Sequence, residues 1–234
     1  MMKQFLSGSN ANGFTLVELT IVLVIVALLT GMMLGPLSAQ KDLQNVRETQ
    51  RQLADIGEAL MGYAASHQAA DGRPHLPCPD TTGDGFENRA GDNTCVDQQG
   101  RLPWTDIGVG HEDAWGNRFS YRVVKEYSNR GAGFVLGTAA ALKVCEDSVC
   151  TVAIASNLPA VVVSHGKNGA GAFNALGGTN PAPVGADEIS NRNASNNFVS
   201  HVPSSVTGSE FDDIVIWISP YILFNRMIAA GKLP

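Results

Sequence analysis

The chain begins with a long apolar run that the pattern of side chains marks as a helix. Residues 19–37 contain no charged side chain, and Glu18 is the one ionisable group in the stretch that begins at Gly13. About 19 helical residues at ~1.5 Å each span roughly 28 Å, close to the hydrocarbon thickness of a bilayer. The run is apolar on every face and longer than the core of a cleaved secretory signal, which favours a transmembrane helix. Pro36 removes a backbone hydrogen bond and predicts a kink or a locally melted turn.

A second helical pattern follows the apolar run. Apolar residues recur at spacings of three, four and seven from Leu43 to Tyr63, with charged residues mostly between them. This periodicity predicts an amphipathic continuation of the helix over residues 38–70, ended by Gly72 and Pro74. Its apolar stripe is expected to pack beneath a sheet.

Residues 71–234 have the pattern of a β-rich globular head. Short apolar runs alternate with Gly, Asn, Asp and Pro, and this alternation predicts hairpins. The strand candidates are the runs that begin at Phe119, Leu142, Ala160 and Asp212. The segment 166–197 is so rich in Gly, Ala and Asn that we expect a long surface loop.

A short helix is predicted at the C-terminus. Ser219 is placed to cap it, Pro220 suits its first turn and Gly231 is placed to stop it. Together with the long N-terminal helix and the strand-rich head, this predicts an α+β fold.

Composition and charge exclude some classes of function. The 234 residues carry 16 Lys and Arg against 22 Asp and Glu, for a net charge of -6. A domain that binds nucleic acid normally shows a basic footprint, so nucleic-acid binding is not expected. The five histidines show no metal-ligand spacing, and Ser164-His165 lacks the surroundings of a nucleophile elbow. We therefore predict no catalytic residues and no enzyme.

The letters GFTLVE at the start of the apolar run carry a family resemblance. They resemble the cleavage and methylation signature of type IV pilins and type II secretion pseudopilins. The resemblance implies a leader over 1–13, cut by a prepilin peptidase after Gly13, and N-methylation of Phe14. It also implies that Glu18 meets the amino terminus of a neighbouring subunit in a filament whose core is formed by residues 14–37. Because an unpaired carboxylate is disfavoured in an apolar bundle, Glu18 would penalise wrong axial registers.

Three blocks of the head extend this resemblance. The stretches DAWGNRFSYRV, SHGKNG and FDDIVIW occur in the same order as three blocks of the major pseudopilin of type II secretion. The resemblance implies a calcium site that uses the carbonyl of His165, the side chain of Asn168 and the carboxylates of Asp213 and Asp212. Asn168 stands where the family has an aspartate, and the loss of a carboxylate lowers calcium affinity. The alternative is a set of turn residues in which Asp212 caps a strand.

A second calcium candidate lies in the stretch DTTGDGFEN. Asp80, Thr82 and Asp84, followed by Gly85, match the first half of the EF-hand loop. Position twelve would be Gly91 rather than Glu, so the motif is incomplete. The alternative is an acidic surface loop stapled by a disulfide.

The four cysteines favour disulfide bonds. Zinc is another interpretation, but no spacing gives a tight C-x-x-C pair, and an oxidising compartment favours disulfides. Cys145 and Cys150 flank the turn-like letters EDSV, so these two are expected to pair, and Cys78 and Cys95 would then close the acidic loop. Other connectivities and free thiols remain open.

These patterns and the resemblance together imply a pilin-like lollipop: a long N-terminal helix on an antiparallel head with a short C-terminal helix. The expected protein is a structural filament subunit, most closely a type II secretion pseudopilin, held as a single-pass protein in the bacterial inner membrane with its head in the periplasm. Its expected partners are prepilin peptidase, other pilin or pseudopilin subunits and the inner-membrane assembly platform. No cofactor is predicted with certainty, and a structural calcium ion is the one candidate. The alternatives are a minor type IV pilin for adhesion or DNA uptake and a membrane-tethered periplasmic hydrolase. A pocket that collects His and carboxylate groups would favour the hydrolase.

Overall fold

A computed structural model describes residues 15–193 and 195–234, and for residues 32–37 it describes the backbone but not the side chains. The leader over 1–13 and Phe14 lie outside the described residues. The chain divides into two units, residues 1–43 and 44–234.

Helix α1 runs from Leu16 to Ser66. Its backbone stays helical through Pro36, so the melted turn predicted there is wrong. In the first unit its described aliphatic side chains are exposed, as at Leu19 and Val22. In the described part of the chain, no helix has the length of apolar sequence that crossing a membrane requires. The membrane span over 14–37 stays a prediction.

In the second unit, α1 carries the apolar stripe that the periodicity predicted. Leu53, Ile56 and Leu60 are at most 1 % exposed and belong to the main core. Thr49 is also fully buried, and its hydroxyl oxygen accepts the N–H of Ala114 at 3.2 Å. The helix ends at Ser66, short of the predicted residue 70, because the chain then reverses through a bridge between residues 68 and 74.

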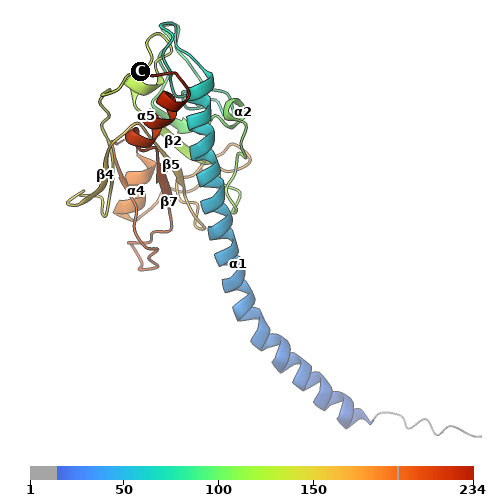
Figure 1. Cartoon of the computed structure of the whole chain (residues 1–234). Helices are drawn as coiled ribbons and strands as arrows, with labels where there is room; N and C mark the ends of the chain where they lie inside the picture. The colour runs from blue at the N-terminus through green and yellow to red at the C-terminus, as the bar shows by residue number, and fades with distance from the viewer. Residues whose placement is uncertain (1–14, 194) are drawn as a thin grey trace, which may run out of the picture. The chain divides into compact units, whose positions relative to one another are not determined.

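The main sheet of the head has four antiparallel strands in the order β1-β2-β5-β7 (Figure 1). The strands are β1 Gln99–Arg101, β2 Ser120–Val123, β5 Ala160–Ser164 and β7 Ile214–Trp217. Strand β5 is buried along its whole length, because the main core lies on one side of it and a smaller core on the other. Of these strands, β1 was not predicted.

A second sheet has three strands in the order β4-β3-β6. The strands are β3 Leu142–Cys145, β4 Ala153–Leu158 and β6 Asn197–Val199. The β3–β4 pair is antiparallel, as predicted, but β3 and β6 are parallel, so the head is not antiparallel throughout.

The long surface loop expected over 166–197 is wrong in its last part. Helix α4 occupies Ala186–Arg192, and Asn197 already begins β6. Asn191 joins the two elements, since its amide N–H donates to the carbonyl of Val199 at 3.0 Å and its oxygen accepts the N–H of Val199 at 2.7 Å. These contacts come from the tertiary fold, which local composition does not reveal.

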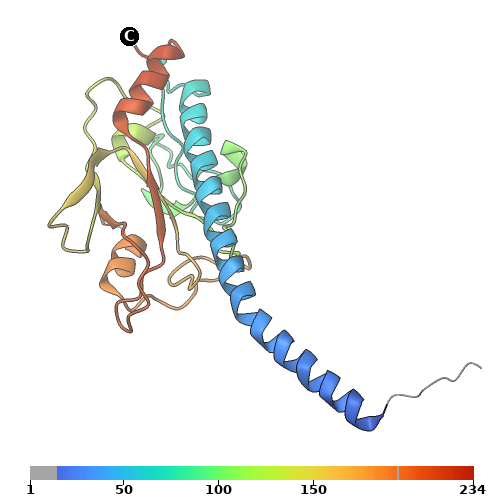
Figure 2. The same ribbon diagram turned by 60° about the horizontal axis from the view of Figure 1, so that its bottom comes forward.

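Three further helices complete the head: α2 Trp104–Ile107, α3 Lys125–Ser128 and α5 Pro220–Ala229. Helix α5 begins at the predicted proline, although Ser219 makes no side-chain cap bond. Figure 1 shows α5 beside the part of α1 that lies in the second unit, where Arg226 contacts both carboxylate oxygens of Glu58 at 2.9 and 3.1 Å. Figure 2 shows β7 leading directly into α5.

Both predicted disulfides are present. Cys78 is bonded to Cys95 and Cys145 to Cys150, which leaves no free cysteine. The first bond lies in the main core, and the second closes the turn that follows β3.

Candidate functional site

Three carboxylates meet where α4 approaches the start of β7. Glu188, Asp212 and Asp213 each place one oxygen within 4.8 Å of the others. Glu188 and Asp213 are buried, and Asp212 is half-buried. Asp212 and Asp213 were predicted for a calcium site, whereas Glu188 was not.

Asn168 reaches this cluster through its N–H groups. Its side-chain nitrogen donates to Glu188 Oε1 at 2.8 Å, and its backbone N–H donates to Asp212 Oδ2 at 2.9 Å. Its side-chain oxygen accepts the N–H of Ala170 at 2.8 Å, which fixes the orientation of the amide. In this arrangement Asn168 donates hydrogen bonds to the carboxylates, and its side-chain oxygen accepts from Ala170 instead of facing the cluster.

His165 borders the cluster from the end of β5. Its carbonyl accepts the N–H of Gly169 at 3.0 Å, and its ring Nδ1 lies 3.6 Å from Asp213 Oδ1. The chain turns between His165 and Gly169, and Gly166 in this turn has φ +59. A Cβ at Gly166 would lie 2.3 Å from Asp212 Oδ1. Glycine is needed here because any side chain would collide with Asp212.

The electrostatics of the cluster favour a cation. Burial raises the pKa of Glu188 and of Asp212, and the charge of Asp213 raises both further. The Oδ1 atoms of Asp212 and Asp213 are buried without a hydrogen-bond partner among the described residues. Buried carboxylate oxygens without partners are costly, and hard oxygen donors of this kind suit calcium. The residues present therefore fit such an ion, with Glu188, Asp212 and Asp213 as the carboxylates that would hold it.

The second predicted loop is organised differently. Asp80 is fully buried, and its carboxylate accepts the backbone N–H groups of Thr82, Gly83 and Gly85 at 2.6–2.9 Å. Asp84 is exposed and accepts the N–H of Phe86. Because the oxygens of Asp80 are already satisfied by backbone donors, this geometry favours the turn over the ion site.

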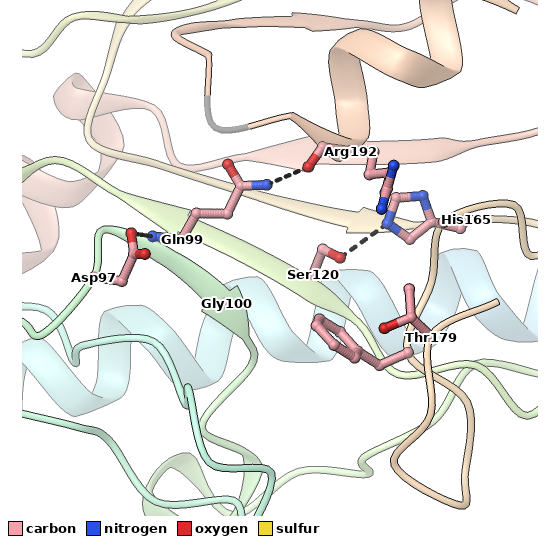
Figure 3. Close-up of a pocket in the computed structure, with 9 residues that line it drawn as sticks. Asp97, Gln99, Gly100, Ser120, His165, Thr179 and Arg192 are labelled. Carbon is pink, nitrogen blue, oxygen red and sulfur yellow. Dashed lines mark hydrogen bonds between the residues drawn. The ribbon is translucent and has the colours of Figure 1, made fainter. Parts of the chain in front are cut away.

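A polar cavity of about 290 Å³ lies on the other side of His165 (Figure 3). The polar side chains that line it are Asp97, Gln99, Ser120, His165, Thr179 and Arg192. Ser120 Oγ lies 2.9 Å from His165 Nε2. The two residues are distant in sequence and meet because Ser120 pairs with Val163, two residues before His165, across β2 and β5.

At the start of α1, Thr15 and Glu18 cap each other. The backbone N–H and the hydroxyl of Thr15 donate to Glu18 Oε2 at 2.9 and 2.8 Å, and the N–H of Glu18 donates to the Thr15 hydroxyl oxygen at 3.2 Å. This is a capping box, in which each side chain satisfies a backbone donor of the helix start.

Residues 8–34, which include this helix start, match the family model described as the prokaryotic N-terminal methylation motif. The chain carries a pilin-type methylation motif. Comparisons with curated proteins and with solved structures gave no match to this chain. The motif implies processing by a prepilin peptidase and assembly with other pilin subunits. The α+β architecture, with its long N-terminal helix and sheet-bearing head, is consistent with a pilin-like fold.

The methylation motif covers all three residues of the predicted processing and assembly site. Gly13 and Phe14 lie outside the described residues, so their roles stay predictions, and Glu18 is found in the capping box. The spacing T-x-x-E could have revealed this box from the sequence. No comparable signal marks Glu188 or Ser120, since their partners are distant in the chain.

Proposed function

We propose that the chain is a structural subunit of a pilus-like filament, most closely a type II secretion-type pseudopilin, and not an enzyme. The observation that carries this proposal is the methylation motif at residues 8–34, which leads into a long helix with exposed aliphatic side chains. A prepilin peptidase would cut after Gly13, and Phe14 would be methylated. A minor type IV pilin for adhesion or DNA uptake remains the structural alternative.

In this proposal residues 14–37 anchor the precursor once across the bacterial inner membrane, with the head in the periplasm. The two disulfides support this side of the membrane, because disulfides persist in oxidising compartments. The inner-membrane assembly platform then transfers the subunit to the filament, where the helix contacts other pilin or pseudopilin subunits.

Processing and assembly can be tested separately. The variant Gly13→Tyr is expected to remain unprocessed, since a bulky residue replaces the glycine at the scissile bond. The variant Glu18→Ala is expected to be processed but excluded from filaments, because it lacks the carboxylate that meets a neighbour's amino terminus. Immunoblots of precursor size and of sheared filaments measure the two steps.

Thr20→Val is a suitable control for this experiment. Within the described residues the Thr20 hydroxyl donates to the carbonyl of Val17 in the same helix turn, so its loss should leave both steps unchanged. Normal processing and assembly of both test variants would contradict the pilin proposal.

We further propose that a structural calcium ion binds at Glu188, Asp212 and Asp213. At a calcium concentration about 100 times Kd, binding to the folded state alone should raise Tm by roughly 5–10 °C for a domain of this size. Asp213→Asn should remove this shift, whereas Asp84→Asn, in the turn around Asp80, should keep it. Differential scanning fluorimetry, first with calcium and then with a chelator, measures the calcium-dependent change in Tm. A Tm that does not respond to calcium in the wild type would overturn the proposal.

One observation favours a hydrolase as a second candidate function. Ser120, His165 and Asp213 are arranged in the order of a nucleophile, a base and an acid. However, 3.6 Å between His165 Nδ1 and Asp213 Oδ1 exceeds hydrogen-bond distance, so the acid does not orient the ring. A fluorophosphonate probe is expected to leave the protein unlabelled. Labelling that Ser120→Ala abolishes would instead establish the hydrolase.

A further inference from the structure

Arg192 is a positioned cation at the polar cavity. Its carbonyl accepts the side-chain N–H of Gln99 at 2.8 Å, and its side chain passes over Gly171, where a Cβ would lie 2.5 Å from Arg192 Cδ. Figure 3 shows this side chain reaching toward His165. Among the described residues its guanidinium has no hydrogen bond or ion pair. Arg192 is exposed, so its guanidinium donors are open to water and to a ligand that enters the cavity.

Acceptors and hydroxyls line the rest of the cavity. Asp97 is fixed by one carboxylate oxygen, which accepts the N–H of Gln99 at 3.1 Å, and it carries a second oxygen. Ser120 shares its hydroxyl with His165, and Thr179 adds another hydroxyl. In Figure 3, Asp97 lies on the opposite side of the cavity from Thr179 and His165, with Ser120 between them. A ligand here would meet acceptors on one side and donors on the other.

Phe173 gives the cavity an aromatic surface. The guanidinium of Arg101 lies 3.8 Å from the centre of its ring and holds the ring by a cation–π contact. A rigid ring among polar groups offers an apolar contact for C–H groups of a ligand whose other edges are polar.

We propose that this cavity binds one uncharged sugar ring of an oligosaccharide. Each sugar hydroxyl both donates and accepts, which matches Arg192 on one side and Asp97 on the other, and the C–H groups of the ring suit Phe173. A free anion is disfavoured by the carboxylate of Asp97, and an apolar ligand would displace water from Arg192 and Asp97 without replacing its hydrogen bonds. The volume of about 290 Å³ is at the small end of ligand pockets, which span ~300–1,000 Å³, and suits a single ring. This site goes beyond filament assembly and does not depend on it.

Saturation-transfer NMR on the full chain tests the proposal. The protein is kept in a detergent without a sugar headgroup, and the probes are methyl β-glucopyranoside, methyl β-galactopyranoside and N-acetylglucosamine. We expect saturation of the ring protons of at least one probe. Arg192→Gln should weaken its binding about tenfold, which is the typical effect of losing a hydrogen bond from a charged group.

Arg226→Gln is the matched control, because Arg226 is exposed, pairs with Glu58 and does not line the cavity. It should bind as the wild type does. Ser120→Ala provides a second test variant and should also weaken binding, with an unchanged Tm showing that the fold is kept. Three silent sugar probes, equal signals from wild type and Arg192→Gln, or binding of glycine or phosphate in place of sugars would each overturn the proposal.

Discussion

Glu87 and Arg89 form a nearly buried ion pair beside the Cys78–Cys95 disulfide. Arg89 Nε and Nη2 each donate to a different oxygen of Glu87 at 2.8 Å, and the N–H of Cys78 donates to Glu87 Oε2 at 2.9 Å. Burial raises the pKa of Glu87, but these hydrogen bonds and the charge of Arg89 outweigh burial and leave that pKa below its usual value. The ionised form is therefore favoured by folding.

The sign of the pH dependence follows from the lowered pKa. The stabilisation is present above the unfolded pKa of Glu87 and is lost as the pH falls through the lower folded pKa. Glu87→Gln keeps an acceptor but loses the charge, so it should reduce the free energy of unfolding by about 2 kcal/mol at pH 7, and the difference from wild type should shrink on acidification. Denaturant unfolding from pH 7 to pH 3 measures this.

Glu48→Gln is the control for the ion-pair experiment. Its partner Arg51 is largely exposed, so this variant should lose at most about 0.5 kcal/mol. An equal loss for Glu87→Gln at every pH would show that packing, and not charge, accounts for the stabilisation.

At the scale of elements, the hydrophobic pattern was enough to predict a helix or strand wherever that element buries a continuous face. Strands β2, β5 and β7 and the stripe around Leu53 were predictable because their side chains supply the cores. Strands β1 and β6 have three residues each, and α4 is held by contacts of Asn191 with Val199 and Asp213. Such short elements depend on partners far along the chain, so local pattern could not predict them.

In the candidate sites, too, some residues could be predicted from local sequence and others depend on partners far along the chain. Asp212 and Asp213 could be named because the motif around them resembles a known block, whereas Glu188 arrives from α4, whose own existence was missed. Ser120 and His165 meet through strand register, which depends on the whole sheet. A sequence pattern can identify a candidate site residue, but the residues that contact it are determined by the topology of the fold.

The turn after β5 allows a test of whether Asp212 is a calcium ligand. Gly166→Ala places a methyl group 2.3 Å from Asp212 Oδ1, whereas Gly208 has a similar positive φ and open space around it. Both alanine variants should lose about 1 kcal/mol through backbone strain, and Gly166→Ala should lose more because its methyl group also collides with Asp212. Gly166→Ala alone should also displace Asp212 and lose the calcium-dependent rise in Tm. If both variants keep that rise, Asp212 is not a ligand.

At the scale of the whole molecule, the two disulfides constrain the unfolded chain to different extents. The bonded cysteines are separated by 17 positions in the Cys78–Cys95 pair and by 5 in the Cys145–Cys150 pair. Loop-closure entropy predicts a loss of about 3 kcal/mol for the double alanine variant of the first pair and about 2 kcal/mol for the second. Because Cys78 and Cys95 also lie in the main core, their replacement leaves a void that adds to the difference. Thermal unfolding of the two variants should show this order, and the reverse order would contradict it.

The capping box at the start of α1 has a consequence for how subunits would join. Thr15 lies after the proposed cleavage point, so removal of the leader leaves both partners of the box in the mature chain. A neighbour's ammonium would then compete with Thr15 for a carboxylate that already has donors. Joining becomes an exchange of partners, whose net free energy is the small difference between two sets of hydrogen bonds. A contact of this kind selects the correct register while leaving each addition of a subunit reversible.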